Sequence, residues 1–309
     1  MKELSSLVAG DRLDLDRLDV KGVDFVALPG YRDYLELRDT LAGRHACDRA
    51  ITDYLVSTRR PLELQAWCVA CRRSSRFVLA NPELFASFCD APNWRETIAC
   101  RGCGLINRLR ASIEMFSSQM NCGLGGPIYL TERVTPLFTW LARNYPEVRG
   151  SEFFGDDRRP GELCTIADMS VPHEDVTKLS MDDGSIGHVL SFDVLEHVPG
   201  YQEALAEFHR VLAPDGTLLL SVPFDLDSDS TLRCASIKSD GSIEHHEPPE
   251  YHGDPVNSGA GVLCFYHFGW DLLDQMRSIG FSEVRLRMYW NPAKAYLGWP
   301  GILITGTKA

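Results

Sequence analysis

From about residue 127 onward the sequence alternates short apolar runs with amphipathic stretches, and this alternation limits the possible folds more than any other feature. Runs such as "PIYL", "GHVLSF" and "GTLLLSVPF" have the length of buried strands. Between them, "PLFTWLARNY", "YQEALAEFHRVL" and "WDLLDQMRSIG" repeat apolar residues at helical intervals. Alternating strands and helices imply βαβ units around a mostly parallel sheet. The sequence therefore predicts an α/β fold with helices on both faces of the sheet.

Four of the ten cysteines form two tight pairs, "CVAC" at 68–71 and "CRGC" at 100–103. Two residues between thiolates allow one turn to present both sulfurs to a tetrahedral Zn²⁺, and a second pair completes the site. Protein would fill all four positions, so the ion would be structural and would stabilise a small lobe. The 28 residues between the pairs exceed the usual spacing, which implies a helical insertion around 81–97. The predicted zinc ligands are Cys68, Cys71, Cys100 and Cys103.

These features divide the chain into three expected parts. Residues 1–60 are rich in Leu, Arg and Asp, and the apolar positions of 31–57 repeat at helical intervals, so we expect a helical segment. Residues 61–115 would form the zinc-binding lobe. Residues 116–309 would form the α/β domain, with an insertion at 225–263 rich in polar residues, Pro and Gly.

The charge of the chain limits its partners and its location. The formal net charge of −12 disfavours a general nucleic-acid binder, because phosphate backbones are held by surplus Lys and Arg. Residues 58–110 differ, with nine Arg against four acidic residues, and an anionic ligand could bind there. No run approaches the roughly 18 apolar residues of a membrane span, and the first residues carry charge where a signal peptide would be apolar. We therefore expect a soluble, cytoplasmic protein with no membrane partner.

One segment carries a family resemblance. "SFDVLEHVPGYQEALAEFHRVLAPDGTLLLSVPF", residues 191–224, resembles the central segment of class I S-adenosylmethionine-dependent methyltransferases: a strand, the "LEHV" turn, a helix ending in "RVLAPDG", and the next strand. The resemblance extends more weakly over about 127–309. It implies a Rossmann-like sheet, S-adenosylmethionine as cofactor and methyl transfer as the reaction.

The resemblance also implies positions for the cofactor's adenine. Within "HEDVTKLSMDDGSIGHVLSFD", Asp175 would accept a hydrogen bond from the adenine amino group, and the Val176 amide would meet a ring nitrogen. A helix cap is the alternative role for Asp175. Phe192 and Asp193, where the central strand ends, would complete these contacts.

The cofactor's carboxylate needs a different solution, because the glycine-rich loop that usually follows the family's first strand is absent from "PIYLTERVTPLFTWL". Thr135 as N-cap, with Pro136 at the first helical position, would start a helix whose free amides point at the anion. Thr131 would add a hydroxyl. Glu152 lies 20 residues after Glu132, close to the span that separates the glycine loop from the ribose-binding acid in dinucleotide folds.

Glu152 is therefore the expected acceptor for the ribose hydroxyls, with Glu132 as the next choice. Phe153, which follows Glu152, would stack on adenine. A chain that kept the fold but lost the cofactor would look similar, and this possibility stays open at the level of sequence.

Three roles compete for the polar residues of "SFDVLEHV". In an open parallel sheet, ligands bind beyond the carboxyl ends of the strands, so these residues face the expected crevice. The first role is structural, with Glu196 capping the next helix and His197 holding a loop. The second makes His197 a general base. The third is a divalent ion, because "DVLEH" resembles the E-x-x-E-H arrangement of ubiquinone-pathway and small-RNA methyltransferases, which implies Asp193, Glu196, His197 and the distant His267 as ligands of Mg²⁺, Mn²⁺ or Zn²⁺.

The insertion after the next strand supplies further candidates. It contains His252 beside Tyr251 in a Pro/Gly-rich stretch, and such insertions commonly cover the acceptor in this fold. A histidine there could contact the acceptor or take its proton, since imidazole exchanges protons near neutral pH. His197, His252 and His267 are thus the catalytic candidates.

The acceptor itself is not written in the sequence. We expect methyl transfer to a small-molecule or sugar-like acceptor on oxygen, because the domain is acidic and the added lobe resembles in arrangement the zinc-bearing lobes of deoxysugar C-methyltransferases. One alternative is an RNA methyltransferase that docks RNA through the arginine-rich lobe. Another is an inactive zinc-ribbon interaction protein.

Overall fold

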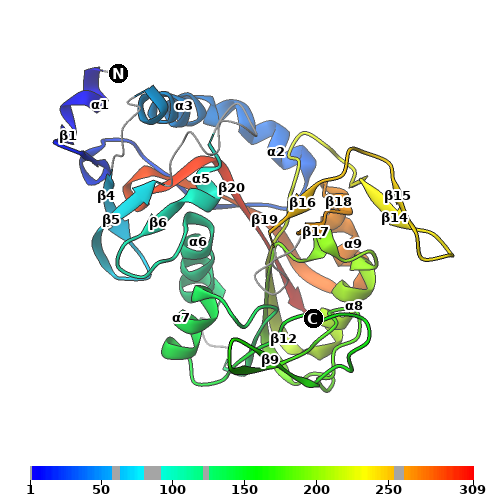
Figure 1. The fold of residues 1–309 in the computed structure, drawn as a ribbon. Coiled ribbons are helices and arrows are strands. Elements are labelled where there is room, and N and C mark those ends of the chain that lie inside the picture. Colours follow the sequence, from blue (N-terminus) through cyan, green and yellow to red (C-terminus); the bar gives the residue numbers. More distant parts are fainter. Residues whose placement is uncertain (1, 58–62, 80–91, 121–124, 254–260) are drawn as a thin grey trace. The chain divides into compact units, whose positions relative to one another are not determined.

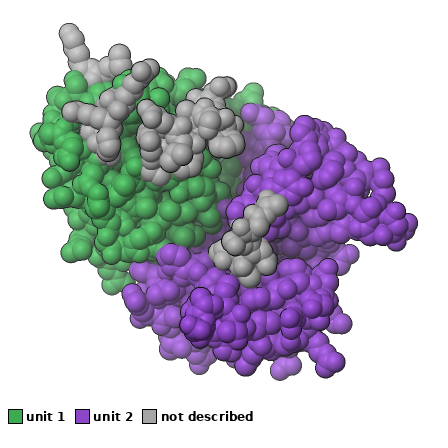
Figure 2. Space-filling view, in the orientation of Figure 1, with its two compact units in different colours: residues 1–28, 32–122, 287–302 green, residues 29–31, 123–286, 303–309 purple. Residues whose placement is uncertain are grey.

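The structure, a computed structural model, describes residues 2–57, 63–79, 92–120, 125–253 and 261–309. The backbone contacts divide the chain into two compact units (Figure 2). Unit 1 comprises residues 1–28, 32–122 and 287–302, and unit 2 comprises 29–31, 123–286 and 303–309.

A seven-stranded sheet runs through the α/β part of the chain, in the order β3-β19-β20-β12-β11-β7-β8. Figure 1 labels β12, β19 and β20 of this sheet. Neighbours β12, β11, β7 and β8 are parallel, and β20 is antiparallel to β12. The strands are β3 (Val23–Leu28), β7 (Ile128–Leu130), β8 (Val148–Gly150), β11 (Ile186–Phe192), β12 (Leu212–Ser221), β19 (Phe281–Asn291) and β20 (Tyr296–Lys308). The predicted Rossmann-like α/β fold is confirmed.

The segment "GHVLSF" is almost entirely apolar because it forms the central strand β11, which is buried. All seven of its residues are buried, as expected for a parallel strand covered on both faces. Its one imidazole, on His188, is satisfied inside the core by the Thr217 hydroxyl at 2.7 Å.

Three helices accompany these strands in unit 2: α7 (Pro136–Asn144), α8 (Tyr201–Val211) and α9 (Asp271–Ile279). Helix α8 connects the parallel strands β11 and β12. It buries Tyr201, Ala204, Leu205, Phe208 and Val211, which recur at helical intervals and form one apolar face.

The remaining strands of unit 2 form small two-stranded sheets outside the main sheet. Strands β9 (Leu163–Ile166) and β10 (Met169–Pro172) form one hairpin. Strand β13 (Leu232–Arg233) of the insertion pairs with β18 (Tyr266–His267), which follows the insertion. Two further pairs lie within the insertion, β14 (Ala235–Ile237) with β15 (Ile243–His245) and β16 (Tyr251–His252) with β17 (Val262–Leu263).

Unit 1 contains a separate five-stranded sheet, in the order β1-β2-β4-β5-β6. Its strands are β1 (Val8–Ala9), β2 (Arg12–Asp14), β4 (Glu63–Cys68), β5 (Arg73–Leu79) and β6 (Ile98–Cys100). Its helices are α1 (Lys2–Ser6), α2 (Tyr31–Arg38, whose first residue is counted with unit 2), α3 (Ala42–Ser57), α5 (Trp94–Thr97) and α6 (Asn107–Met115), which continues into a π-helical turn at Phe116–Met120. Most of the expected insertion at 81–97 lies outside the described residues, apart from 92–97.

The expectation of a helical N-terminal segment is correct for 31–57 and wrong for 8–28, which contains three strands. Strand β2 pairs in parallel with β4, and in β3 Val23, Phe25 and Leu28 are buried whereas Asp24 and Ala27 are exposed. The leucines and aspartates of this stretch fit a period of two when a sheet edge is available, and that edge is supplied by residues distant in sequence.

The contacts also group the chain differently from the three expected parts. Residues 287–302 belong to unit 1, because Asp48 on α3 accepts hydrogen bonds from the Trp290 indole (2.7 Å) and from the Gly298 and Trp299 amides. Residues 1–60 and 61–115, expected as two parts, share this unit apart from 29–31. In the described chain, no helix combines the length and the apolar character needed to cross a membrane.

Candidate functional site

The sheet topology of unit 2 indicates where a ligand would bind. The chain leaves β7 for its neighbour β8 on one side and later returns to β11 on the other. Ligands in open α/β sheets bind beyond the carboxyl ends of the strands at such a reversal. The residues that follow β7, β8 and β11 are therefore the ones to consider first.

Beyond β7, the chain starts α7 as the sequence predicts. Thr135 is the N-cap, its hydroxyl accepts a hydrogen bond from the Phe138 amide at 3.2 Å, and Pro136 occupies the first turn. Helix N-termini with free amides attract anions. The Thr131 hydroxyl, just after β7, donates to the Ser191 hydroxyl at 3.3 Å.

Beyond β8, the buried carboxylate of Glu152 binds the loop between β7 and α7. Its Oε1 atom accepts hydrogen bonds from the Arg133 amide (2.7 Å) and the Val134 amide (2.9 Å). At Gly150, the last residue of β8, a Cβ atom would lie 2.6 Å from the Phe138 ring, so only glycine fits. Glu152 thus positions the loop in which the sequence predicts cofactor contacts.

The expected adenine contacts lie on the segments after β8 and β10. Asp175 accepts from the amide (2.9 Å) and hydroxyl (2.7 Å) of Thr177. It therefore caps a turn rather than a helix, the alternative expected from the sequence, and half-buried Val176 follows it in this turn. Phe153 is 48% exposed, and its ring centroid lies 5.4 Å from that of His173. Sequence analysis did not single out His173, which is buried and accepts from the Phe154 amide at 3.0 Å.

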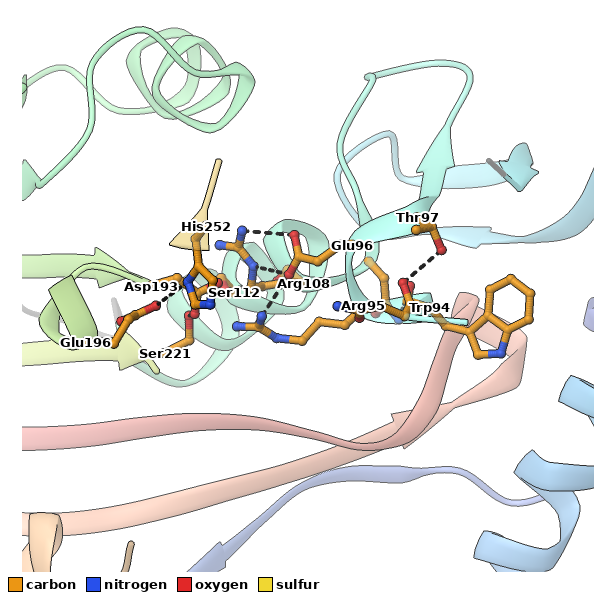
Figure 3. Close-up of polar contacts among 12 residues, drawn as sticks. Trp94, Arg95, Glu96, Thr97, Arg108, Ser112, Asp193, Glu196, Ser221 and His252 are labelled. Atoms are coloured by element: carbon orange, nitrogen blue, oxygen red, sulfur yellow. Dashed lines mark hydrogen bonds and ion pairs between the residues drawn. The ribbon is translucent and has the colours of Figure 1, made fainter. Parts of the chain in front are cut away.

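At the end of β11, buried Phe192 precedes Asp193, which adopts a left-handed backbone conformation with φ of 53°. Such a conformation costs a non-glycine residue on the order of 1–2 kcal/mol and is concentrated at functional sites. The Asp193 carboxylate accepts from the Ser221 hydroxyl at 2.9 Å, where β12 ends (Figure 3).

Directly after Asp193, two imidazoles and a carboxylate come together. We call Glu196, His197 and His252 the histidine–carboxylate cluster. Glu196 Oε1 lies 3.8 Å from His197 Nε2 and 3.7 Å from His252 Nδ1, and the two ring nitrogens are 3.1 Å apart. Glu196 is fully buried, and Figure 3 shows it directed at His252.

Glu250 and His267 extend this cluster. Glu250 Oε1 lies 2.9 Å from His252 Nε2, and its Oε2 lies 2.8 Å from His267 Nε2. The structure therefore brings Glu196 and His197 together with His252. Of the other two expected ion ligands, Asp193 contacts Ser221 and His267 contacts Glu250. Glu250 was missed, although its i, i+2 spacing to His252 in "PEYH" is a readable signal once that segment is a strand.

The charges of the cluster shift its proton affinities. The Glu196 carboxylate, 3.7 Å away, and then the hydrogen bond to Glu250 raise the pKa of His252 to about 9 against the effect of burial. Burial raises the pKa of Glu196, and the nearby Asp193 charge raises it further. Although partial burial opposes ionisation of Glu250, hydrogen bonds from His252 and His267 hold its pKa below the usual value.

In unit 1, the four paired cysteines converge as predicted. Their sulfurs all lie within 4.8 Å of one another, with Cys68 to Cys103 and Cys71 to Cys100 each at 3.8 Å. In a tetrahedral zinc site with Zn–S bonds of about 2.3 Å, the sulfurs are about 3.8 Å apart, so this cluster fits the ion. A Cβ atom at Gly102 would lie 3.0 Å from Cys71 Sγ, which explains the glycine in this turn.

Two cavities lie outside these sites. One of about 420 Å³ is lined by β7, β8 and the β9–β10 hairpin and contains none of the expected cofactor residues. The other, of about 330 Å³, lies beside the cysteines and includes Arg73, Arg76 and Arg101. Arg76 and Arg101 both pair with Glu63, which reduces the positive charge there.

Comparison with known proteins identifies the chemistry of unit 2. Residues 141–220, which include β8, β11, α8 and most of β12, match the family model described as a methyltransferase domain. The protein is a methyltransferase. Its general activity is thus methyl transfer from S-adenosylmethionine. A search of curated proteins found no match to the chain.

Solved structures similar to this methyltransferase share little sequence with it. A Mesorhizobium loti S-adenosylmethionine-dependent methyltransferase is 14% identical over 60% of this chain and 92% of its own, with a TM-score of 0.38. The Burkholderia thailandensis 1,6-didemethyltoxoflavin-N1-methyltransferase is 19% identical over 64% and 79%, with a TM-score of 0.35. A Haemonchus contortus phosphoethanolamine N-methyltransferase is 12% identical over 65% and 53%, with a TM-score of 0.37.

Proposed function

We propose that this methyltransferase methylates a hydroxyl group of a small-molecule acceptor in the crevice beyond β7 and β11. The observation that carries the proposal is the histidine–carboxylate cluster, which follows the central strand directly. A hydroxyl must lose its proton as it is methylated, and an imidazole paired with carboxylates is the usual group that accepts one. Binding of the cofactor does not require such a cluster, and neither does the Rossmann-like fold.

For the cofactor, the residues after each strand offer a consistent set of contacts. The N-terminus of α7, capped by Thr135, suits the carboxylate of the methionine moiety, with Thr131 beside it. Glu152 would accept from the ribose hydroxyls while it holds the loop after β7, with Glu132 as the nearby second acid. Phe153, Asp175 and Val176 would surround the adenine, an arrangement that the exposed Phe153 ring supports.

Phe192 and Asp193 would lie against the middle of the cofactor, at the end of β11. S-adenosylmethionine supplies a sulfonium methyl, whose S–C bond breaks as the acceptor oxygen forms its new bond. The protein's part is to align the two groups, exclude water and take the hydroxyl proton onto the cluster. His197 is held for this by its Nδ1 atom, which lies 2.8 Å from the Leu263 carbonyl oxygen.

We propose in addition that Cys68, Cys71, Cys100 and Cys103 bind one structural zinc ion. The tetrahedral spacing of the sulfurs supports this assignment, because uncoordinated thiols gain little from such close approach. The Gly102 amide, 3.3 Å from Cys100 Sγ, would stabilise thiolate charge. An RNA acceptor is less well supported, since Glu63 neutralises part of the arginine cavity beside the cysteines.

Transfer of a labelled methyl group tests the proposed reaction. The full chain is incubated with methyl-labelled S-adenosylmethionine and panels of sugars, nucleotide sugars, phenols, amines and RNA, and products are identified by mass spectrometry. We expect label on an oxygen of a small molecule. Label found only on RNA, or only on nitrogen, would overturn the acceptor class, and calorimetry with S-adenosylhomocysteine reports cofactor binding independently.

A further inference from the structure

Three atoms of the histidine–carboxylate cluster have the spacing of ligands around one ion. The separations of 3.8, 3.7 and 3.1 Å define a triangle formed by Glu196 Oε1, His197 Nε2 and His252 Nδ1. The point equidistant from these atoms lies about 2.1 Å from each, the length of a bond from a divalent transition metal to imidazole or carboxylate.

The surroundings of Glu196 make such an ion physically useful. Glu196 is fully buried, and neither carboxylate oxygen has a hydrogen-bond partner among the described residues. A buried carboxylate without hydrogen bonds is costly unless a cation compensates it. The ring nitrogens His197 Nε2 and His252 Nδ1 lie 3.8 and 3.7 Å from Glu196 Oε1, too far for hydrogen bonds.

The two imidazoles are also oriented as metal ligands usually are. His197 Nδ1 lies 2.8 Å from the Leu263 carbonyl oxygen, and His252 Nε2 lies 2.9 Å from Glu250 Oε1. If these nitrogens donate their hydrogens outward, the remaining lone pairs, on His197 Nε2 and His252 Nδ1, face each other and Glu196. Metal-bound histidines characteristically donate their other N–H to a carbonyl or carboxylate in this way.

We propose that Glu196, His197 and His252 bind a divalent first-row transition metal ion, with Glu250 as the positioning residue for His252. Two imidazoles and one carboxylate favour Zn²⁺, Mn²⁺, Fe²⁺ or Co²⁺ over Mg²⁺ and Ca²⁺, which prefer oxygen. Three protein ligands leave coordination positions open for a ligand oxygen. This last step rests on the proposed function: the acceptor hydroxyl binds at an open coordination position of the ion, where coordination lowers the pKa of the hydroxyl.

This set differs from the one that sequence resemblance implies. His252 takes the position expected for His267, which instead contacts the second oxygen of Glu250 at 2.8 Å. Asp193 accepts from Ser221 and is not part of the triangle. The ligand from the insertion therefore comes 55 positions after His197 rather than 70.

Binding of Mn²⁺ to the full chain tests the site without any assay of activity. Manganese is a good probe because thiolates favour softer ions, so the cysteines compete poorly for it. Protein that keeps its cysteine-bound zinc but has been freed of weaker-bound ions by mild chelation is titrated with Mn²⁺, and free ion is measured by electron paramagnetic resonance. We expect one bound Mn²⁺ per chain, and an affinity at least tenfold weaker in Glu196→Gln, His197→Ala and His252→Ala.

Matched variants separate a metal site from a structural cluster. His245→Ala changes an exposed histidine of the same insertion and should leave Mn²⁺ affinity unchanged. Glu250→Gln should weaken binding by about 10- to 100-fold, as is typical when the partner of a metal-bound histidine is removed. Circular dichroism and calorimetry with S-adenosylhomocysteine establish that each variant is folded.

Two results would overturn the proposal. One is no Mn²⁺ or Co²⁺ binding to the wild type beyond what Cys100→Ser abolishes. The other is equal affinity in folded Glu196→Gln, His252→Ala and wild-type protein. Either result leaves the proposed methyl transfer intact, whereas retained metal binding with no methylated product would overturn only the proposed function.

Discussion

The four-cysteine cluster of unit 1 and the histidine–carboxylate cluster of unit 2 present ligand atoms by different means. The cysteines come in two C-x-x-C turns, each of which directs two sulfurs inward through its own backbone. The second cluster combines Glu196 and His197, which follow β11, with His252 on β16 of the insertion. The cysteine cluster is built from two copies of one local turn. The histidine–carboxylate cluster forms only when two segments distant in sequence meet.

The difference separates a structural role from a chemical one. Four sulfurs fill a tetrahedral shell and leave no position for a substrate. Three ligands, two of which follow the central strand and one of which comes from the insertion, would leave the site open at the edge of the sheet where ligands bind. Removing a sulfur should therefore damage the fold, and removing an imidazole should damage the reaction.

Cys100→Ser should have the largest effect on stability. We expect loss of the bound zinc and destabilisation of unit 1 by on the order of 5 kcal/mol or more, because metal binding and folding of such lobes are coupled. Metal analysis and thermal unfolding measure both, with Cys47→Ser on α3 as control. Wild-type protein that lacks zinc and has also lost thiol reactivity would indicate disulfides instead.

His197→Ala should have the largest effect on the reaction. Loss of the group that accepts or organises the hydroxyl proton should lower kcat about a hundred-fold or more while the Kd for S-adenosylmethionine changes little. His245→Ala should retain full activity. If His197→Ala lowers only the melting temperature, and the folded fraction stays active, the cluster is structural and the comparison fails.

Glu152→Ala should weaken cofactor binding without affecting either cluster. Hydrogen bonds to a charged group contribute about 1.5–3 kcal/mol each, so the Kd for S-adenosylmethionine should rise ten- to a hundred-fold. Glu147→Ala, an exposed change before β8, is the matched control. Calorimetry that finds unchanged affinity in a folded Glu152→Ala variant would move the ribose contact to Glu132.

Glu207→Gln should have the smallest effect, and one that depends on pH. Hydrogen bonds from Arg210 hold the pKa of Glu207 below its usual value of 4.5, with the Leu179 amide as a further donor. Because the folded pKa is lowered, this stabilisation is present above about pH 4.5 and is lost as the pH falls through the folded value.

We therefore expect Glu207→Gln to cost about 1–2 kcal/mol at pH 7 and progressively less below pH 4.5. Urea unfolding of unit 2 at several pH values measures this difference. The exposed Glu203→Gln on the same helix should cost almost nothing. A cost independent of pH would mean that shape, rather than charge, fixes α8 to the loop at 179–183.

Much of unit 2 was readable in the sequence because its signals are local. The apolar run of β11, the amphipathic pattern of α8 and the Thr135–Pro136 start of α7 each depend on neighbours within a few residues. The strands at 8–28 were not readable, because short segments become strands only when a partner edge exists. The same applies to residues 287–302, which Asp48 holds in unit 1.

The candidate site residues also fall into those that local sequence predicts and those that depend on the tertiary structure. The sequence alone determined that the four paired cysteines form one cluster, since C-x-x-C spacing presents both sulfurs of a pair through one turn of backbone. It also determined that Glu196 and His197 end a buried strand and so lie at a ligand-binding edge. Only the tertiary structure decided that His252 joins them, that Glu250 holds His252, and that His267 does not. The physical reason is that the path of the insertion depends on strand pairing between distant residues, such as Tyr251 with Leu263, which no local pattern encodes.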